Sequence, residues 1–237
     1  MKLTLAVSSV ALSLALGCHR DQPKPTRTVA LPDISLSIYP EEVDREFEEM
    51  RRLADSMHRG DELIIIPITG NARNDTPGHI LRLVAPQSRA PFDSDMVAFR
   101  KKADAEIAAM EDWAKSKPAT RTDIFGSLEV AERECRQRTA TPTTLIIFSD
   151  FLEDDGLTDL RVEPALVSPE RAPMYARQVR RSLEAAVLIS NVSMVQLRSK
   201  DATNMSPARM RAVESFWKEL LKLEGDATPD KNPTSEP

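Results

Sequence analysis

The sequence contains little cysteine, glycine or aromatic residue, and these scarcities exclude several classes of function. Only seven of the 237 residues are glycine, so the Gly-rich loops that cradle phosphates or dinucleotides have little to be built from. Aromatic residues make up 5% of the chain and the net charge is -5, so neither stacking platforms nor a basic surface for nucleic acid is expected. The three histidines, His19, His58 and His79, lack the spacing of a zinc site. The sequence contains no Gly-x-Ser-x-Gly elbow and no Cys–His pairing that would indicate nucleophilic catalysis.

The N-terminus has the features of an export signal. Lys2 precedes an uncharged stretch, Leu3 to Leu16, that is short for a stable membrane span. The stretch leads into Leu-Ala-Leu-Gly-Cys, which resembles the lipobox of bacterial lipoproteins, although Ala15 stands where the usual Leu would be. The resemblance implies that residues 1–18 contain a signal peptide and that Cys18 is diacylated and becomes the new N-terminus. An ordinary secretory signal that happens to contain a cysteine is the alternative.

Lipidation would place the protein in the cell envelope, because two acyl chains give stable membrane attachment. We expect the periplasmic side of a membrane, and His19 after Cys18 favours the outer membrane by the rule that holds for enterobacteria-like lipoproteins. Cys135 is then the remaining thiol, predicted to be a small, half-buried residue on a helix. No structural disulfide is expected.

The rest of the chain predicts one domain between two irregular ends. Residues 19–27 are polar and Pro-rich, as expected of a tether, and residues 225–237 are expected to be disordered. Between them, residues 28–224 alternate short apolar runs with amphipathic stretches, which predicts an α/β fold with a doubly wound, mainly parallel sheet flanked by helices. The expected strands are 28–34, 62–69, 80–84 (an antiparallel edge), 144–148 and 192–197, and the expected helices are 41–58, 95–115, 123–138, 173–188 and 206–225.

The segment that follows the first strand carries the candidate chemistry. Side chains at alternate positions of an extended segment point the same way, so Asp33, Ser35 and Ser37 should converge at the strand end. Hydroxyl and carboxylate oxygens suit a hard cation such as Mg²⁺. Taken alone, the same residues are also typical of an ordinary turn or helix cap.

Two further segments extend this pattern. Thr122 and Asp123 open a predicted helix, and Ser149 and Asp150 end the predicted strand at 144–148. Together with Asp33-x-Ser35-x-Ser37, they resemble, in order and spacing, the metal-ion-dependent adhesion site of von Willebrand factor A (VWA) domains, from about residue 29 to about 222. The family usually has Gly after the last Asp, whereas this sequence has a Phe.

The resemblance implies a Rossmann-like VWA fold and a specific set of metal ligands. Ser35, Ser37 and Thr122 would bind Mg²⁺, or Mn²⁺ or Ca²⁺, directly, and Asp33 and Asp150 would contribute directly or through water. The remaining position would be open to an acidic residue of a protein partner. In a doubly wound sheet, Asp33 and Asp150 would face each other at the topological switch point, where such sheets bind ligands.

Several readings remain open. The first is a lipid-anchored VWA-like module without catalytic machinery, which binds a protein partner and no nucleic acid. The second is a Mg²⁺-dependent phosphohydrolase or nuclease, disfavoured because Ser35 and Ser37 stand where a second carboxylate would be needed. The third is a metal-free structural domain. Separately, Glu153-Asp154-Asp155 with Asp159 is a weaker calcium candidate that lacks the spacing of an EF-hand and is more typical of a solvated loop.

Overall fold

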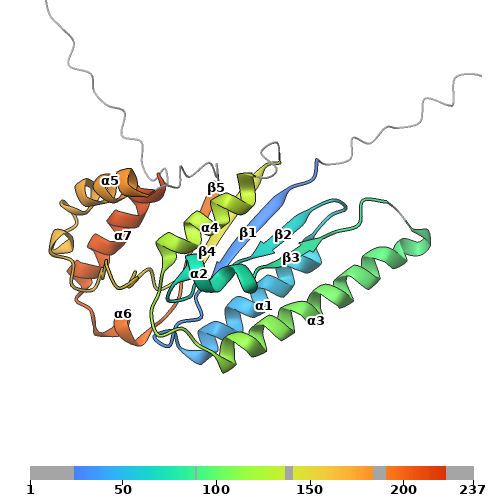
Figure 1. Ribbon diagram of the computed structural model, residues 1–237, viewed down its shortest axis with the longest axis horizontal. Coiled ribbons are helices and arrows are strands. Elements are labelled where there is room, and N and C mark those ends of the chain that lie inside the picture. The colour runs from blue at the N-terminus through green and yellow to red at the C-terminus, as the bar shows by residue number, and fades with distance from the viewer. Residues whose placement is uncertain (1–23, 89, 137–140, 184–190, 223–237) are drawn as a thin grey trace, which may run out of the picture.

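A five-stranded sheet with the order β3-β2-β1-β4-β5 runs through the middle of the molecule (Figure 1). The computed structural model describes residues 24–88, 90–136, 141–183 and 191–222. The central pairings are parallel, with Val29 of β1 opposite Ile64 of β2 and Leu145 of β4, whereas β3 pairs with β2 antiparallel. The strands are β1 (Arg27–Pro32), β2 (Glu62–Ile65), β3 (Leu81–Val84), β4 (Thr143–Ser149) and β5 (Asn191–Gln196).

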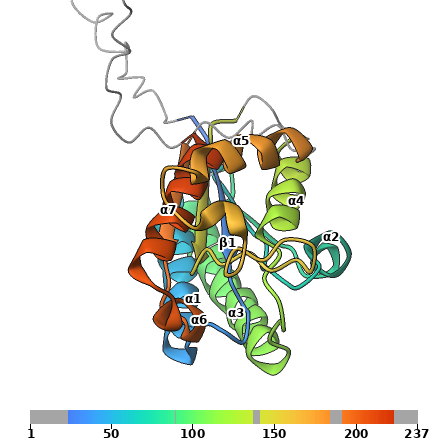
Figure 2. The same cartoon turned by 90° about the vertical axis from the view of Figure 1, so that its left-hand side faces the viewer.

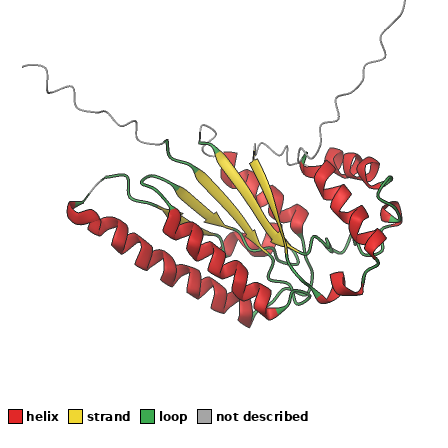
Figure 3. Ribbon diagram, turned by 180° about the vertical axis from the view of Figure 1, so that it is seen from behind, coloured by secondary structure: helices red, strands yellow, loops and turns green. Residues whose placement is uncertain are grey.

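Helices cover both faces of this sheet, because its inner strands are apolar on both sides. The helices are α1 (Pro40–Ser56), α2 (Ala72–Asp75), α3 (Ser94–Ser116), α4 (Ile124–Arg136), α5 (Ala172–Ser182), α6 (Lys200–Asn204) and α7 (Pro207–Leu221), with 3-10 turns at Thr76–Gly78, Pro91–Asp93 and Pro164–Leu166. Helices α1 and α3 lie side by side on one face (Figure 3). Helices α4, α5 and α7 enclose the core on the other (Figure 2).

Alternate residues of β1 enter the two cores, as the strand repeat requires. Ala30 packs with Phe47 and Met50 of α1. Val29 and Leu31 belong to the opposite core, which contains Phe216 and Trp217 of α7. The parallel order and the two helical layers therefore bring the carboxyl ends of β1 and β4 together at one edge of the sheet.

The observed architecture confirms the predicted α/β class, the parallel inner strands and the antiparallel edge at β3. Ser206 caps α7 by accepting a hydrogen bond from Arg209 N, as expected of its position before Pro207. Arg27, which sequence alone placed in the tether, is the first residue of β1 and is buried. Short helices α2 and α6 were not predicted, since four or five residues carry no measurable periodicity.

The proposed signal peptide, Cys18, most of the tether and the tail at 225–237 lie outside the described residues, as does the end of the helix predicted to reach residue 188. Within the described ranges, none of the helices is both long enough and apolar enough to span a membrane. Cys135 is a buried free thiol.

Candidate metal site

Asp33 stands directly after β1 and is fully buried, with 0% of its surface exposed. Its Oδ2 accepts a hydrogen bond from Ser149 Oγ at 2.6 Å, and its Oδ1 accepts one from the Ser35 backbone N–H at 3.0 Å. Ser149 is the last residue of β4, so the carboxylate joins the ends of the two neighbouring strands. Sequence reasoning treated Ser149 only as the neighbour of Asp150, and its role follows from the pairing of β1 with β4.

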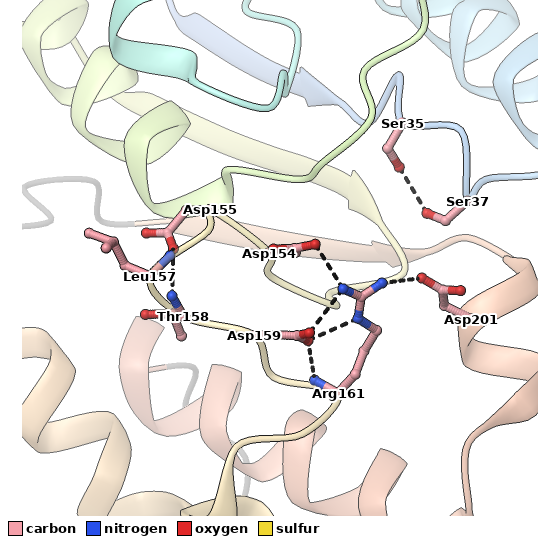
Figure 4. Close-up of polar contacts among 9 residues, drawn as sticks. All are labelled: Ser35, Ser37, Asp154, Asp155, Leu157, Thr158, Asp159, Arg161 and Asp201. Atoms are coloured by element: carbon pink, nitrogen blue, oxygen red, sulfur yellow. Dashed lines mark hydrogen bonds and ion pairs between the residues drawn. The ribbon is translucent and has the colours of Figure 1, made fainter.

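Ser35 and Ser37 point toward each other beyond the end of β1 (Figure 4), with 2.9 Å between their Oγ atoms. Ser35 is buried and Ser37 is half-buried, so this hydroxyl pair reaches from the interior to the surface. The predicted convergence of alternate side chains is present for this pair.

Asp150 follows β4 and is 1% exposed. Its Oδ1 accepts a hydrogen bond from the Leu152 backbone N–H at 2.9 Å, whereas its Oδ2 is buried without a hydrogen-bond partner among the described residues. Burial and the nearby charge of Asp33 raise the pKa of Asp150 to about 7. A buried carboxylate oxygen without a partner is costly, and a bound cation would remove that cost.

Burial also raises the pKa of Asp33, against the hydrogen bonds from Ser149 and Ser35 that lower it. Behind Asp33 lies Glu46 of α1, which is 1% exposed and whose Oε2 accepts a hydrogen bond from the Asp33 backbone N–H at 3.3 Å. Burial and the charge of Asp33 hold the pKa of Glu46 well above its usual range. Sequence reasoning missed Glu46. Its signal was a carboxylate beside Phe47, within the apolar stripe of α1.

Thr122 is buried between the loops that follow β1 and β4. The loop leading to it pairs with the segment after β1, because Ala119 N donates to Ile34 O at 3.0 Å and Leu36 N donates to Ala119 O at 2.8 Å. On its other side, Thr122 N donates to Asp154 O at 3.2 Å. These hydrogen bonds place the loop that contains Thr122 beside the segments after β1 and β4, which carry the other candidate ligands.

Phe151 occupies the position after Asp150 where Gly is usual in VWA domains, and its φ of 63° lies in the left-handed region that favours glycine. Phe151 adopts this left-handed backbone conformation although its Cβ makes the conformation unfavourable. The Phe151 ring is buried and packs edge-on against Trp217 at 5.9 Å between centroids, and its carbonyl accepts a hydrogen bond from Trp217 Nε1 at 2.8 Å. Tertiary contacts with α7 therefore hold the turn that glycine would form by itself.

Arg161 fastens the loop after β4 to the neighbouring α6 (Figure 4). Its guanidinium pairs with Asp154 at 2.7 Å, with Asp159 at 2.9 Å and with Asp201 of α6 at 2.8 Å. The hydrogen bonds from the Arg161 guanidinium and backbone N–H, with its charge, lower the pKa of Asp159. Two acids of the run considered as a calcium site are thus balanced by an arginine, which was not evident from the sequence.

Comparisons with known proteins give similarity only among solved structures, since no family model and no curated protein matches the sequence. BatB from Bacteroides thetaiotaomicron is 14% identical with a TM-score of 0.43, covering 82% of this chain and 86% of that one. A von Willebrand factor type A structure from Catenulispora acidiphila is 15% identical with a TM-score of 0.41, covering 81% and 43%. Manganese-loaded TRAP protein from Plasmodium vivax is 12% identical with a TM-score of 0.43, covering 87% and 65%.

Proposed function

We propose that this chain is a VWA-like binding module that holds one divalent cation and, through it, a protein partner. The proposed ligands are Asp33, Ser35, Ser37, Thr122 and Asp150. The observation that carries the proposal is the buried, unpartnered Oδ2 of Asp150, which lies close enough to Asp33 for the charge of one to raise the pKa of the other.

The donor set suits Mg²⁺ or Mn²⁺, which prefer oxygen ligands and retain water in part of the shell. Both carboxylate oxygens of Asp33 already accept a hydrogen bond, which favours contact with the cation through water. The Ser35 and Ser37 hydroxyls are neutral, so the cation would keep positive charge toward the half-buried side of the pair. An Asp or Glu side chain of the partner is the complementary ligand for that position.

A binding role is favoured over phosphohydrolase chemistry. A hydrolase of this kind needs a carboxylate that reaches the substrate beside the metal. Of the other carboxylates near this pair in the described residues, Asp201 of α6, whose charge reaches Asp150, is paired with Arg161 at 2.8 Å, and Glu46 of α1 is buried against the backbone of Asp33. Glu46 therefore holds the backbone of the segment after β1 in place and does not contact a substrate.

The N-terminal pattern supports attachment to a membrane of the cell envelope through a lipid on Cys18. In the described part of the chain, β1 begins at Arg27 and the proposed site follows its other end. Six residues of strand span about 20 Å. The proposed site therefore lies at the edge of the sheet opposite the one that a tether would enter, and it would face away from the membrane.

The test is titration calorimetry of Mn²⁺ and Mg²⁺ into the purified protein and into a Ser35→Ala/Ser37→Ala variant. We expect the unmodified protein to bind Mn²⁺, and the Ser35→Ala/Ser37→Ala variant to bind it at one site fewer. The matched control is Ser56→Ala/Ser182→Ala, which removes two exposed hydroxyls that bond to carbonyls of their own helices. Equal binding by both double variants would remove the serines from the site, and a protein that binds neither ion would favour the metal-free structural alternative.

A further inference from the structure

Three carboxylates that the proposed site does not use meet at the N-terminus of α4. Asp123 precedes the helix, and Glu153 and Asp155 lie on the loop after β4. We infer that these three side chains form a second divalent cation site, separate from the first, and that Ca²⁺ is its ligand. The inference does not depend on the proposed function.

The geometry matches the size of a calcium coordination shell. One oxygen from each of Asp123, Glu153 and Asp155 lies within 4.8 Å of the other two. Oxygen ligands stand at about 2.3–2.6 Å from Ca²⁺, so two oxygens bound to the same ion are separated by at most about 5 Å. The three carboxylates therefore already lie at separations that one ion satisfies.

Glu153 supplies a separate observation, because its side chain is 0% exposed and only half satisfied. Its Oε2 accepts hydrogen bonds from the backbone N–H groups of Ile124 at 2.8 Å and Phe125 at 3.3 Å. Its Oε1 is buried without a hydrogen-bond partner among the described residues. A fully buried carboxylate of a cluster that keeps one oxygen free has the arrangement of a metal ligand, since burial without a partner is otherwise unfavourable.

Local hydrogen bonds orient the other two carboxylates without neutralising them. Asp123 accepts bonds from the backbone N–H groups of Gly126 at 2.6 Å and Ala72 at 2.9 Å, and Asp155 Oδ1 accepts one from Leu157 at 2.7 Å. The charge of Arg73 reaches Asp123 and partly offsets the rise that burial causes in the pKa of Asp123, and Arg73 itself pairs with Glu129. The adjacent Asp154, by contrast, points toward Arg161 (Figure 4).

A cavity of about 530 Å³ gives the cluster access to solvent, and Asp123 and Asp155 line it together with Arg73 and Arg121. An ion held by three carboxylates there has room for water molecules in the rest of its shell. Ca²⁺ takes six to eight oxygen ligands in flexible geometry, whereas Mg²⁺ requires a near-ideal octahedron. Three acids placed by two loops therefore favour Ca²⁺.

The experiment measures Ca²⁺ binding by calorimetry in the Ser35→Ala/Ser37→Ala background, where the first site is removed. We expect one Ca²⁺ per chain in this background and at least about tenfold weaker binding when Asp155→Asn is added, because the charge and number of ligands set calcium affinity. Glu153→Gln should act alike, and its amide oxygen still accepts the α4 backbone N–H groups. Asp154→Asn is the matched control, since it removes the same charge from the same loop outside the cluster.

Each outcome decides the inference. Loss of binding in Asp155→Asn and Glu153→Gln, with retention in Asp154→Asn and unchanged thermal unfolding midpoints, supports the second site. Absence of Ca²⁺ binding in the serine background, or equal binding by Asp155→Asn and its control, overturns it while leaving the first site intact. If the proposed first site binds no cation, the unmodified protein and the Ser35→Ala/Ser37→Ala variant bind Ca²⁺ equally well. In that case Asp155→Asn still weakens Ca²⁺ binding.

Discussion

At the scale of single residues, the molecule contains buried carboxyl groups whose pKa values are raised in the folded state. Burial raises the pKa of Asp33, Glu46 and Asp150, with Asp150 at about 7. In the unfolded chain these acids titrate near pH 4, so between pH 4 and 7 the metal-free folded protein binds more protons than the unfolded chain. The stability that these three groups contribute is therefore lost as pH rises through this window.

This gives a prediction for Asp150→Asn, which keeps an acceptor for the Leu152 N–H and removes the titrating group. One proton corresponds to a slope of about 1.4 kcal/mol per pH unit. The variant should lose up to that much of the slope between pH 5 and 7, measured by urea unfolding with a chelator present. Asp159→Asn is the control, because the pKa of Asp159 is lowered by Arg161 and the group stays ionised throughout. An unchanged slope in Asp150→Asn would contradict the assignment of the proton to this carboxyl.

At the scale of elements, α7 supports the start of the loop after β4 through Trp217, which packs against Phe151 and donates a hydrogen bond to its carbonyl. Trp217→Phe removes the hydrogen bond to the Phe151 carbonyl and leaves that carbonyl buried without a donor. We expect a loss of about 2–4 kcal/mol in the free energy of unfolding, together with weaker Mn²⁺ binding, because the turn with φ of 63° adjoins Asp150.

Trp113→Phe is the matched control for this prediction, since Trp113 Nε1 has no hydrogen-bond partner among the described residues. The same substitution there should cost about 1 kcal/mol or less, with Mn²⁺ affinity unchanged. Equal destabilisation by the two variants in chemical unfolding would show that lost volume, and not the bond to Phe151, explains the effect.

The elements also differ in how far they can be predicted from the sequence. Short apolar runs predict the buried inner strands, alternation predicts the outer strands, and helical periodicity predicts the long helices, because burial of one or both faces dictates each pattern. The same alternation predicts that the Ser35 and Ser37 side chains converge. Glu46 and the positive φ of Phe151 were not predicted, because both depend on what packs against them from distant parts of the chain. The burial of Glu153 was not predicted either. Its sequence context is typical of a solvated loop, whereas its side chain is buried and accepts hydrogen bonds from backbone N–H groups at the start of α4.

At the scale of the whole molecule, the parallel order gathers buried acids at one edge of the sheet, where the loops after β1 and β4 and the start of α4 meet. Such an edge is unfavourable without a counter-charge, so cation binding should stabilise the whole fold. A ligand at 100 times its dissociation constant adds about 2.7 kcal/mol. For a protein of this size, that raises the thermal midpoint by roughly 5–11 °C.

We therefore expect Mn²⁺ to raise the unfolding midpoint of the protein in calorimetric scans, and a chelator to reverse the rise. The Ser35→Ala/Ser37→Ala variant should lose the part of the rise that comes from the first site, while Ser56→Ala/Ser182→Ala should respond as the unmodified protein does. Because both double variants lose two hydroxyls, only a difference between them reports on the cation. The same rise in both would mean that Mn²⁺ stabilises the molecule from outside the proposed site, and the acidic cluster at Asp123, Glu153 and Asp155 would be the first place to look.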